Sequence, residues 1–96
     1  MLYFTFMAFH LTLLLCDNML VSGSTLAAEI FKFAEAMGRT VQHGVRDVVI
    51  QRITPDGLPV HTSAGFELQP THRLGEECPS DLIHIPALWR NPRPAQ

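Results

Sequence analysis

The residues best suited to chemistry stand near the end of the chain, in the segment DLIHIPALWRNPRP from Asp81 to Pro94. Its apolar part, Leu82 to Leu88, predicts a buried strand, and Trp89, Arg90 and Asn91 follow directly. Ligands of open α/β sheets bind just beyond the carboxyl ends of the strands. An aromatic face beside a guanidinium suits a small polar ligand with an amide or quaternary ammonium group. These three residues are therefore pocket candidates, although a tryptophan at the core edge and a solvated arginine would give the same pattern.

Glu29 is a second pocket candidate, within a predicted amphipathic helix. The helix is indicated by apolar residues at spacings of four, three and four, namely Leu26, Ile30, Phe33 and Met37. Glu29 borders this apolar stripe and belongs to the early turns, so it can reach the carboxyl ends of neighbouring strands. An ordinary carboxylate flanking a buried helix face would have the same spacing.

The thiols and imidazoles predict no catalytic or metal site. Cys16 follows a predicted strand and Cys78 precedes Pro79 in a loop, so neither has the strand-turn-helix setting that lowers a thiol pKa. We interpret both as reduced, structural thiols. The five histidines match no zinc-ligand spacing, and the sequence contains no GxGxxG, Walker or GxSxG motif. The sequence thus predicts no catalytic residue, no metal and no cofactor.

Length and charge limit the domain count and the partners. A chain of 96 residues holds one domain at most, and its formal charge of −2 provides no basic surface for nucleic acid. The first sixteen residues are apolar, but no lysine or arginine precedes Lys32, and Thr5, His10 and Thr12 interrupt the run. We predict a cytoplasmic protein without membrane contact; export or membrane insertion is the alternative that this apolar start leaves open.

The remaining patterns predict an alternation of strands and one helix. Phe9–Leu15 is expected to be a central parallel strand, and the helix over Leu26–Met37 should end at Gly38. We expect the stripe of this helix to lie on the sheet and Lys32 and Glu35 to face water. Further along the chain we expect a strand at Val45–Ile53, a hairpin of Val60–Ser63 and Phe66–Gln69, a polar connection over Thr71–Pro79 and the last strand.

Three runs of this sequence resemble, in order, the amino-terminal half of a ThiJ/PfpI domain, the class I glutamine amidotransferase-like fold. They are LLLCDNMLVSGSTLAAEIF, ITPDGLPVHTSAGFELQP and DLIHIPALWRNPRP. More narrowly, the chain is similar to the sensor domain that precedes the helix-turn-helix module in AraC-type transcriptional regulators. The resemblance implies an incomplete flavodoxin-like three-layer α/β sandwich with a mostly parallel sheet. Residues 1–96 would form a partial domain, with 1–8 as a lead-in and the carboxyl-terminal half absent.

The resemblance also implies roles for particular residues. Glu29 stands where ThiJ/PfpI enzymes have a glutamate facing an elbow cysteine, and that cysteine would lie downstream of the last strand. Ala87 and Leu88 stand where the enzyme branch has a Gly-Gly turn that helps to form an oxyanion site. This departure favours the sensor branch over the enzymes.

The resulting prediction is an amino-terminal fragment of a non-catalytic, small-molecule-sensing domain of an AraC-type regulator. Its effector would be small and polar or amidated, DNA would be bound only through a module absent from this chain, and the family allows a homodimer. The alternatives are a fragment of a cysteine-dependent ThiJ/PfpI hydrolase or amidase-like enzyme, and a truncated chain with no independent activity.

Overall fold

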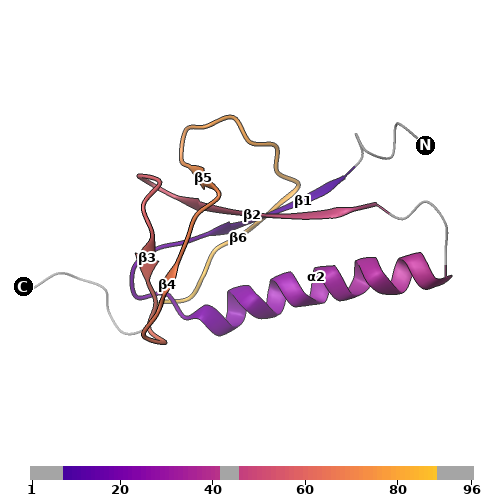
Figure 1. Cartoon of the computed structure of the whole chain (residues 1–96), viewed down its shortest axis with the longest axis horizontal. Coiled ribbons are helices and arrows are strands. Elements are labelled where there is room, and N and C mark those ends of the chain that lie inside the picture. The colour runs from indigo at the N-terminus through magenta and orange to yellow at the C-terminus, as the bar shows by residue number, and fades with distance from the viewer. Residues whose placement is uncertain (1–7, 42–45, 89–96) are drawn as a thin grey trace, which may run out of the picture.

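The structure is a computed structural model that describes residues 8–41 and 46–88, and it contains one long helix and six strands (Figure 1). The elements are β1 (Phe9–Leu14), α2 (Val21–Val41), β2 (Val48–Thr54), β3 (Val60–His61), β4 (Glu67–Leu68), β5 (His72–Arg73) and β6 (Leu82–His84). Within this described part, no helix is long and apolar enough to cross a membrane.

Four of the strands form one parallel sheet with β1 in its interior. The strand order is β5-β2-β1-β6, and each neighbouring pair in it is parallel. Leu11 of β1 pairs with Ile50 of β2 on one side and with Leu82 of β6 on the other. The hairpin β3-β4 is antiparallel and forms a separate two-stranded sheet. The predicted α/β fold with a mostly parallel sheet, an incomplete flavodoxin-like arrangement, is therefore confirmed.

The buried core is centred on β1 and on the loop that follows it. Its buried apolar members are Leu11, Leu13, Leu15, Met19 and Val60. Because β1 has a strand on each side and cover on both faces, it tolerates a continuous apolar sequence, as is typical of parallel sheets. The strand predicted at Phe9–Leu15 is thus present and central, one residue shorter.

A polar network covers the sheet face opposite the helix. Thr12, which is buried in β1, donates a hydrogen bond to Ser80 Oγ (2.7 Å) and accepts one from Gln51 Nε2 (2.9 Å). Gln51 Nε2 also donates to the carbonyl of Pro79 (2.8 Å). The connection before β6 is therefore held across β1 and β2 by side chains whose polar atoms are satisfied.

Helix α2 covers the other face of the sheet, but with a different side from the one predicted. Phe31 stacks on Phe9 of β1 with ring centroids 5.3 Å apart, and Ser24 and Glu35 are buried on the same side of the helix. The stripe expected to face the sheet, which consists of Leu26, Ile30, Phe33 and Met37, is exposed instead. The prediction of the buried face was wrong because it followed the stripe with the most large side chains, whereas one aromatic residue, Phe31, and the polar Ser24 and Glu35 make the contact.

Glu35 and Lys32 attach the middle of α2 to the start of β2. Glu35 Oε2 accepts a hydrogen bond from the main-chain N–H of Val48 (2.6 Å), and Lys32 Nζ donates to the carbonyl of Val48 (3.2 Å). The two side chains also form an ion pair of 2.7 Å. The expectation that both would face water is wrong for Glu35, whose side chain is 6% exposed. The N–H and the carbonyl of Val48 therefore both have hydrogen-bond partners on the side of β2 that faces away from β1.

Other boundaries also differ from the sequence prediction. Helix α2 runs through Gly38 to Val41, so this glycine does not end it. The segment expected to be a polar connection contains β5, which pairs with the end of β2 through Ile53 and Thr54. The final strand is shorter than expected and ends at His84, because Leu88 instead bridges back to Met19.

Replacing Glu35 with alanine is expected to lower the free energy of unfolding by about 2 to 4 kcal/mol, because the N–H of Val48 and the Lys32 ammonium both lose a buried partner. Urea denaturation of Glu35→Ala, with Glu29→Ala on the exposed side of the same helix as control, measures this. Glu29→Ala should change the free energy of unfolding by less than about 0.5 kcal/mol. Equal losses in the two variants would show that Glu35 does not anchor the helix.

Candidate functional site

The strand order creates a crevice at the carboxyl ends of β1 and β6. After β1 the chain forms helix α2 and then β2, which lies on one side of β1. Later the chain forms β6, which lies on the other side of β1. The order of the strands in the sheet therefore reverses between β1 and β6. In open α/β sheets this topological switch point is where ligands bind, because the separating connections leave a gap above the strand ends.

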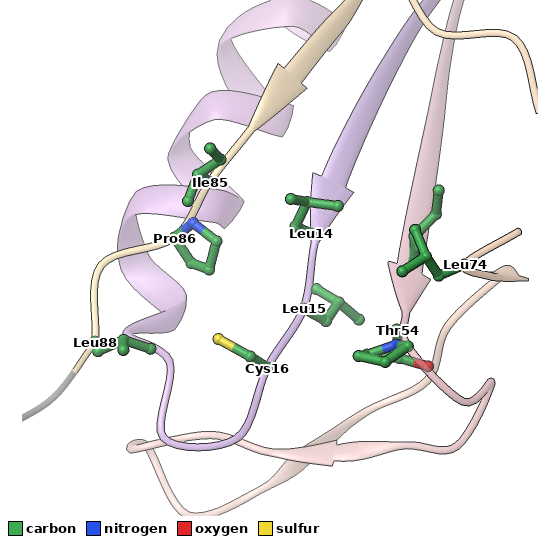
Figure 2. Close-up of a pocket in the computed structure, with 10 residues that line it drawn as sticks. Leu14, Leu15, Cys16, Thr54, Leu74, Ile85, Pro86 and Leu88 are labelled. Carbon is green, nitrogen blue, oxygen red and sulfur yellow. The ribbon is translucent and has the colours of Figure 1, made fainter. Parts of the chain in front are cut away.

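A pocket of about 310 Å³ lies at this position (Figure 2). The end of β1 and the segment after β6 form two of its walls, and the end of β2 and the turn after β5 form the others. The lining consists of Leu14, Leu15, Cys16, Ile53, Thr54, Pro55, Leu74, Ile85, Pro86 and Leu88. Apart from one threonine and one thiol these side chains are apolar, so the pocket favours the apolar part of a ligand. Its volume is at the lower end of the range for small-molecule sites.

The loop after β1 is held in place from two directions. The N–H of Leu20 donates to the carbonyl of Ala87 (2.8 Å), and the carbonyl of Met19 accepts from the N–H of Ser63 in the hairpin (3.0 Å). Asp17 Oδ1 accepts from the N–H of His61 (3.0 Å). Main-chain bonds thus connect the residues next to Cys16 both to the hairpin and to the segment after β6. These hydrogen bonds fix the backbone from which Leu15, Cys16 and Leu88 line the pocket.

Cys16 contributes a protonated thiol to the pocket. Burial raises the pKa of the Cys16 thiol above its ordinary value of 9.0, and the neighbouring Asp17 carboxylate raises this pKa further. Its sulfur points into the space between the ends of β1 and β6 (Figure 2). Since the thiolate is the nucleophilic form, these surroundings make Cys16 a poor nucleophile at neutral pH.

Thr54 stands at the end of β2 beneath the turn that follows β5. Thr54 is fully buried, and its carbonyl accepts a hydrogen bond from the N–H of Leu74 (2.9 Å). Its hydroxyl has no hydrogen-bond partner among residues 8–41 and 46–88. Because the hydroxyl oxygen itself is buried, it is not accessible to a ligand in the pocket.

His84 lies on the helix side of the sheet, away from the polar network. Its Nδ1 is 3.4 Å from the hydroxyl of Ser24, which is buried in the first turns of α2. This contact gives the His84 imidazole a hydrogen-bonding partner between the sheet and α2. No group of histidine, cysteine, aspartate or glutamate in the described ranges is arranged to hold a metal ion.

Of the four predicted site residues the structure describes only Glu29, which lies apart from this pocket. Glu29 is exposed on the side of α2 that faces away from the sheet, and it is not among the residues that line the pocket. Trp89, Arg90 and Asn91 lie outside the described residues, although Leu88, which precedes them, lines the pocket.

Sequence reasoning missed most of the lining residues, although a signal for them was present. Leu14 and Leu15 end an apolar strand, and Ile85 and Pro86 follow directly after β6. The carboxyl end of the last strand was expected several residues too late, at Leu88, because the apolar run continues past the last strand pair. A proline after a short β-rich run is the feature that marks the earlier end.

Comparison with known proteins supports the fold. No protein-family profile matches the chain, and no curated protein matches it. A solved structure, that of a DJ-1 superfamily protein from Agrobacterium tumefaciens, is similar to it with a TM-score of 0.57 and 23% sequence identity. The match covers 83% of this chain and 38% of that protein, so the chain spans well under half the length of this relative. The likeness supports the ThiJ/PfpI-type fold that the sequence suggested.

The alkylation of Cys16 is expected to be slow at neutral pH. In a Cys78→Ser variant, the rate of reaction with iodoacetamide should rise with pH and show its inflection above 9.0, because burial and Asp17 both disfavour the thiolate. The rate can be followed by mass spectrometry, with the Asp17→Asn variant as a comparison whose inflection should move down. An inflection near neutral pH would mean that Cys16 is activated.

Replacing Thr54 with valine is expected to leave stability unchanged or to raise the free energy of unfolding by up to about 1 kcal/mol, because the change removes a buried hydroxyl without a partner. Thr12→Val is the matched control: its hydroxyl is bonded on two sides, so the same change should cost about 1 to 3 kcal/mol. Thermal or urea denaturation of both variants provides the test. A large loss in Thr54→Val would reveal a hydrogen bond that the hydroxyl makes in solution.

Proposed function

We propose that this chain is the amino-terminal part of a non-catalytic domain that binds a small molecule, as the sensing domain of an AraC-type transcriptional regulator. The observation that carries the proposal is the apolar pocket at the carboxyl ends of β1 and β6, at the switch point of the sheet. DNA would be bound through a module outside this chain, in keeping with the formal charge of −2. The expected location of such a regulator is the cytoplasm.

The chemistry of the pocket lining indicates which chemical groups the effector should carry. The lining offers mainly aliphatic side chains, so it would hold an apolar group of the effector instead of its polar end. Polar or amidated groups would then contact residues at the pocket mouth, and Trp89, Arg90 and Asn91 follow the last lining residue in the sequence. An effector with a small apolar body and one polar or amide group fits both features.

The alternative proposal is a fragment of a cysteine-dependent hydrolase or amidase-like enzyme. In this chain it would rest on Glu29, together with an elbow cysteine downstream of the last strand. Glu29 is exposed and outside the pocket, so it lends this alternative no support. The raised pKa of the Cys16 thiol agrees with the expectation that Cys16 does not replace the elbow cysteine. Sequence downstream of Gln96 in a longer protein separates the two: a basic helix-turn-helix pair identifies the regulator, and a cysteine elbow followed by a histidine identifies the enzyme.

Binding to the pocket can be tested with indole, which has a small apolar body and one N–H group. In an amide-detected NMR titration of the ¹⁵N-labelled chain, we expect shifts at Leu15, Cys16 and Ile85. Leu74→Trp, which fills the pocket from the turn after β5, should weaken indole binding at least about fivefold by removing apolar contact area.

Leu58→Trp is the matched control, because Leu58 and Leu74 are similarly exposed, at 60% and 63%, and Leu58 lies outside the pocket. The control should leave indole affinity within about twofold of the unmodified chain. Saturable shifts that avoid the pocket, or equal weakening by both variants, would contradict the proposal.

A further inference from the structure

A second hollow, which is polar, lies on the surface at the carboxyl end of the edge strand β5. Its volume is about 330 Å³, and its lining consists of Gly57, Pro70, Thr71, His72, Arg73 and Glu76. None of these residues lines the apolar pocket, although Leu74, which follows Arg73, does (Figure 2). The polar hollow is therefore a separate site next to the first.

The turn after β2 positions the side chain of Arg73. Gly57 in that turn has a φ of +79°, a left-handed conformation that glycine adopts without strain. A β-carbon at Gly57 would lie 3.4 Å from Cβ of Arg73 and 3.7 Å from its Cγ and Cδ. The main chain of the turn therefore lies against the aliphatic part of this arginine, and this contact limits the rotamers that Arg73 can adopt.

Glu76 is held beside the main chain of Arg73. Its Oε1 accepts a hydrogen bond from the N–H of Arg73 (3.0 Å), and its own N–H donates to the carbonyl of Arg73 (3.1 Å). Gly75 between them has a φ of +99°, which permits this tight turn. The second carboxylate oxygen, Oε2, has no hydrogen-bond partner within residues 8–41 and 46–88. Glu76 thus offers the hollow one free acceptor on a fixed carboxylate.

The guanidinium of Arg73 has no counterion in the described part of the chain. Within the ranges 8–41 and 46–88 it forms neither an ion pair nor a hydrogen bond, although Glu76 binds the main chain of the same residue. Asp56, the carboxylate of the neighbouring turn, accepts from the N–H of Leu58 (3.0 Å) and does not line the hollow. Arg73 is therefore available to an anionic ligand.

We propose that this hollow binds a small carboxylate with an amide N–H next to the carboxyl group, the chemistry of an N-acylated amino acid. The planar guanidinium of Arg73 matches a carboxylate through two parallel hydrogen bonds. Glu76 Oε2 accepts the N–H of the ligand. The charge of Glu76 also disfavours phosphate, which carries more negative charge than a carboxylate. This site goes beyond the proposed effector pocket and does not depend on it.

N-acetylglycine is the probe, and N-acetylsarcosine, in which a methyl group replaces the amide hydrogen, is its matched control. In an amide-detected NMR titration of the ¹⁵N-labelled chain at constant ionic strength, N-acetylglycine should give saturable shifts at Gly57, Arg73 and Glu76. N-acetylsarcosine should bind at least about threefold more weakly, because it cannot donate a hydrogen bond to Glu76. Inorganic phosphate should also bind more weakly than N-acetylglycine.

Two arginines on neighbouring strands provide the matched protein variants. Arg73→Gln should weaken N-acetylglycine binding at least about tenfold, because the bidentate partner of the carboxylate is lost. Arg52→Gln removes the same charge outside the hollow, from a side chain whose Nε donates to the carbonyl of Gln69 (2.7 Å). This control should change the affinity less than about twofold. Circular dichroism checks that both variants are folded.

Three results would overturn the proposed site: no saturable shift with N-acetylglycine, equal weakening by both variants, or equal affinity for N-acetylsarcosine. Tighter binding of phosphate would overturn the ligand class. An acetylated Ala-Ala-Gly peptide separates two sources of the same chemistry: tighter binding than N-acetylglycine indicates the carboxyl end of a peptide, and equal or weaker binding indicates a free small molecule. Because indole should shift Leu15, Cys16 and Ile85 instead, failure of one site is distinguishable from failure of the other.

Discussion

The structure depends on β1 being hydrogen-bonded to a parallel strand on each side. Its pairing with β2 requires a long crossover, which α2 supplies, and its pairing with β6 brings the chain back to the opposite side. The core is centred on this strand, and the strand order reverses between β1 and its neighbour β6. The pocket at Leu14–Cys16 is thus a direct consequence of where β1 stands in the sheet.

The order of the elements other than β5 could be predicted from the sequence, because apolar runs of different length distinguish a strand from a helix, whereas β5 consists of the polar pair His72–Arg73. The orientation of α2 could not be predicted in the same way. Its sheet-facing side consists of Ser24, Phe31 and Glu35, and only tertiary contacts with Phe9, Val48 and His84 show why these residues are buried. Periodicity selects the bulkier stripe, but a helix lies closest to a sheet where its side chains are small or have partners.

The candidate pocket lies at the carboxyl ends of the strands, but the residues that line it could not be predicted from the sequence. The carboxyl end of the last strand does face the switch point, as the rule for α/β sheets requires. The lining residues, however, come from strand ends and turns that meet only after folding, such as Ile53 and Leu74 beside Pro86. Glu29 borders the apolar stripe as predicted, but the stripe faces outward, so the carboxylate is carried away from the pocket.

The pocket and the outer stripe of α2 lie on different parts of the molecule, and the helix connects them. The amino-terminal end of α2 starts beside the loop of Met19 and Leu20, which the segment after β6 holds. A ligand between the ends of β1 and β6 would contact that segment, on a different part of the molecule from the outer face of α2.

Intermolecular nuclear Overhauser effects with indole test most directly whether the switch-point pocket receives a small apolar molecule. We expect contacts between the indole ring protons and the methyl groups of Leu15, Ile85 and Leu88. Contacts confined to Leu26 and Ile30 on the outer face of α2, with none in the pocket, would contradict this expectation.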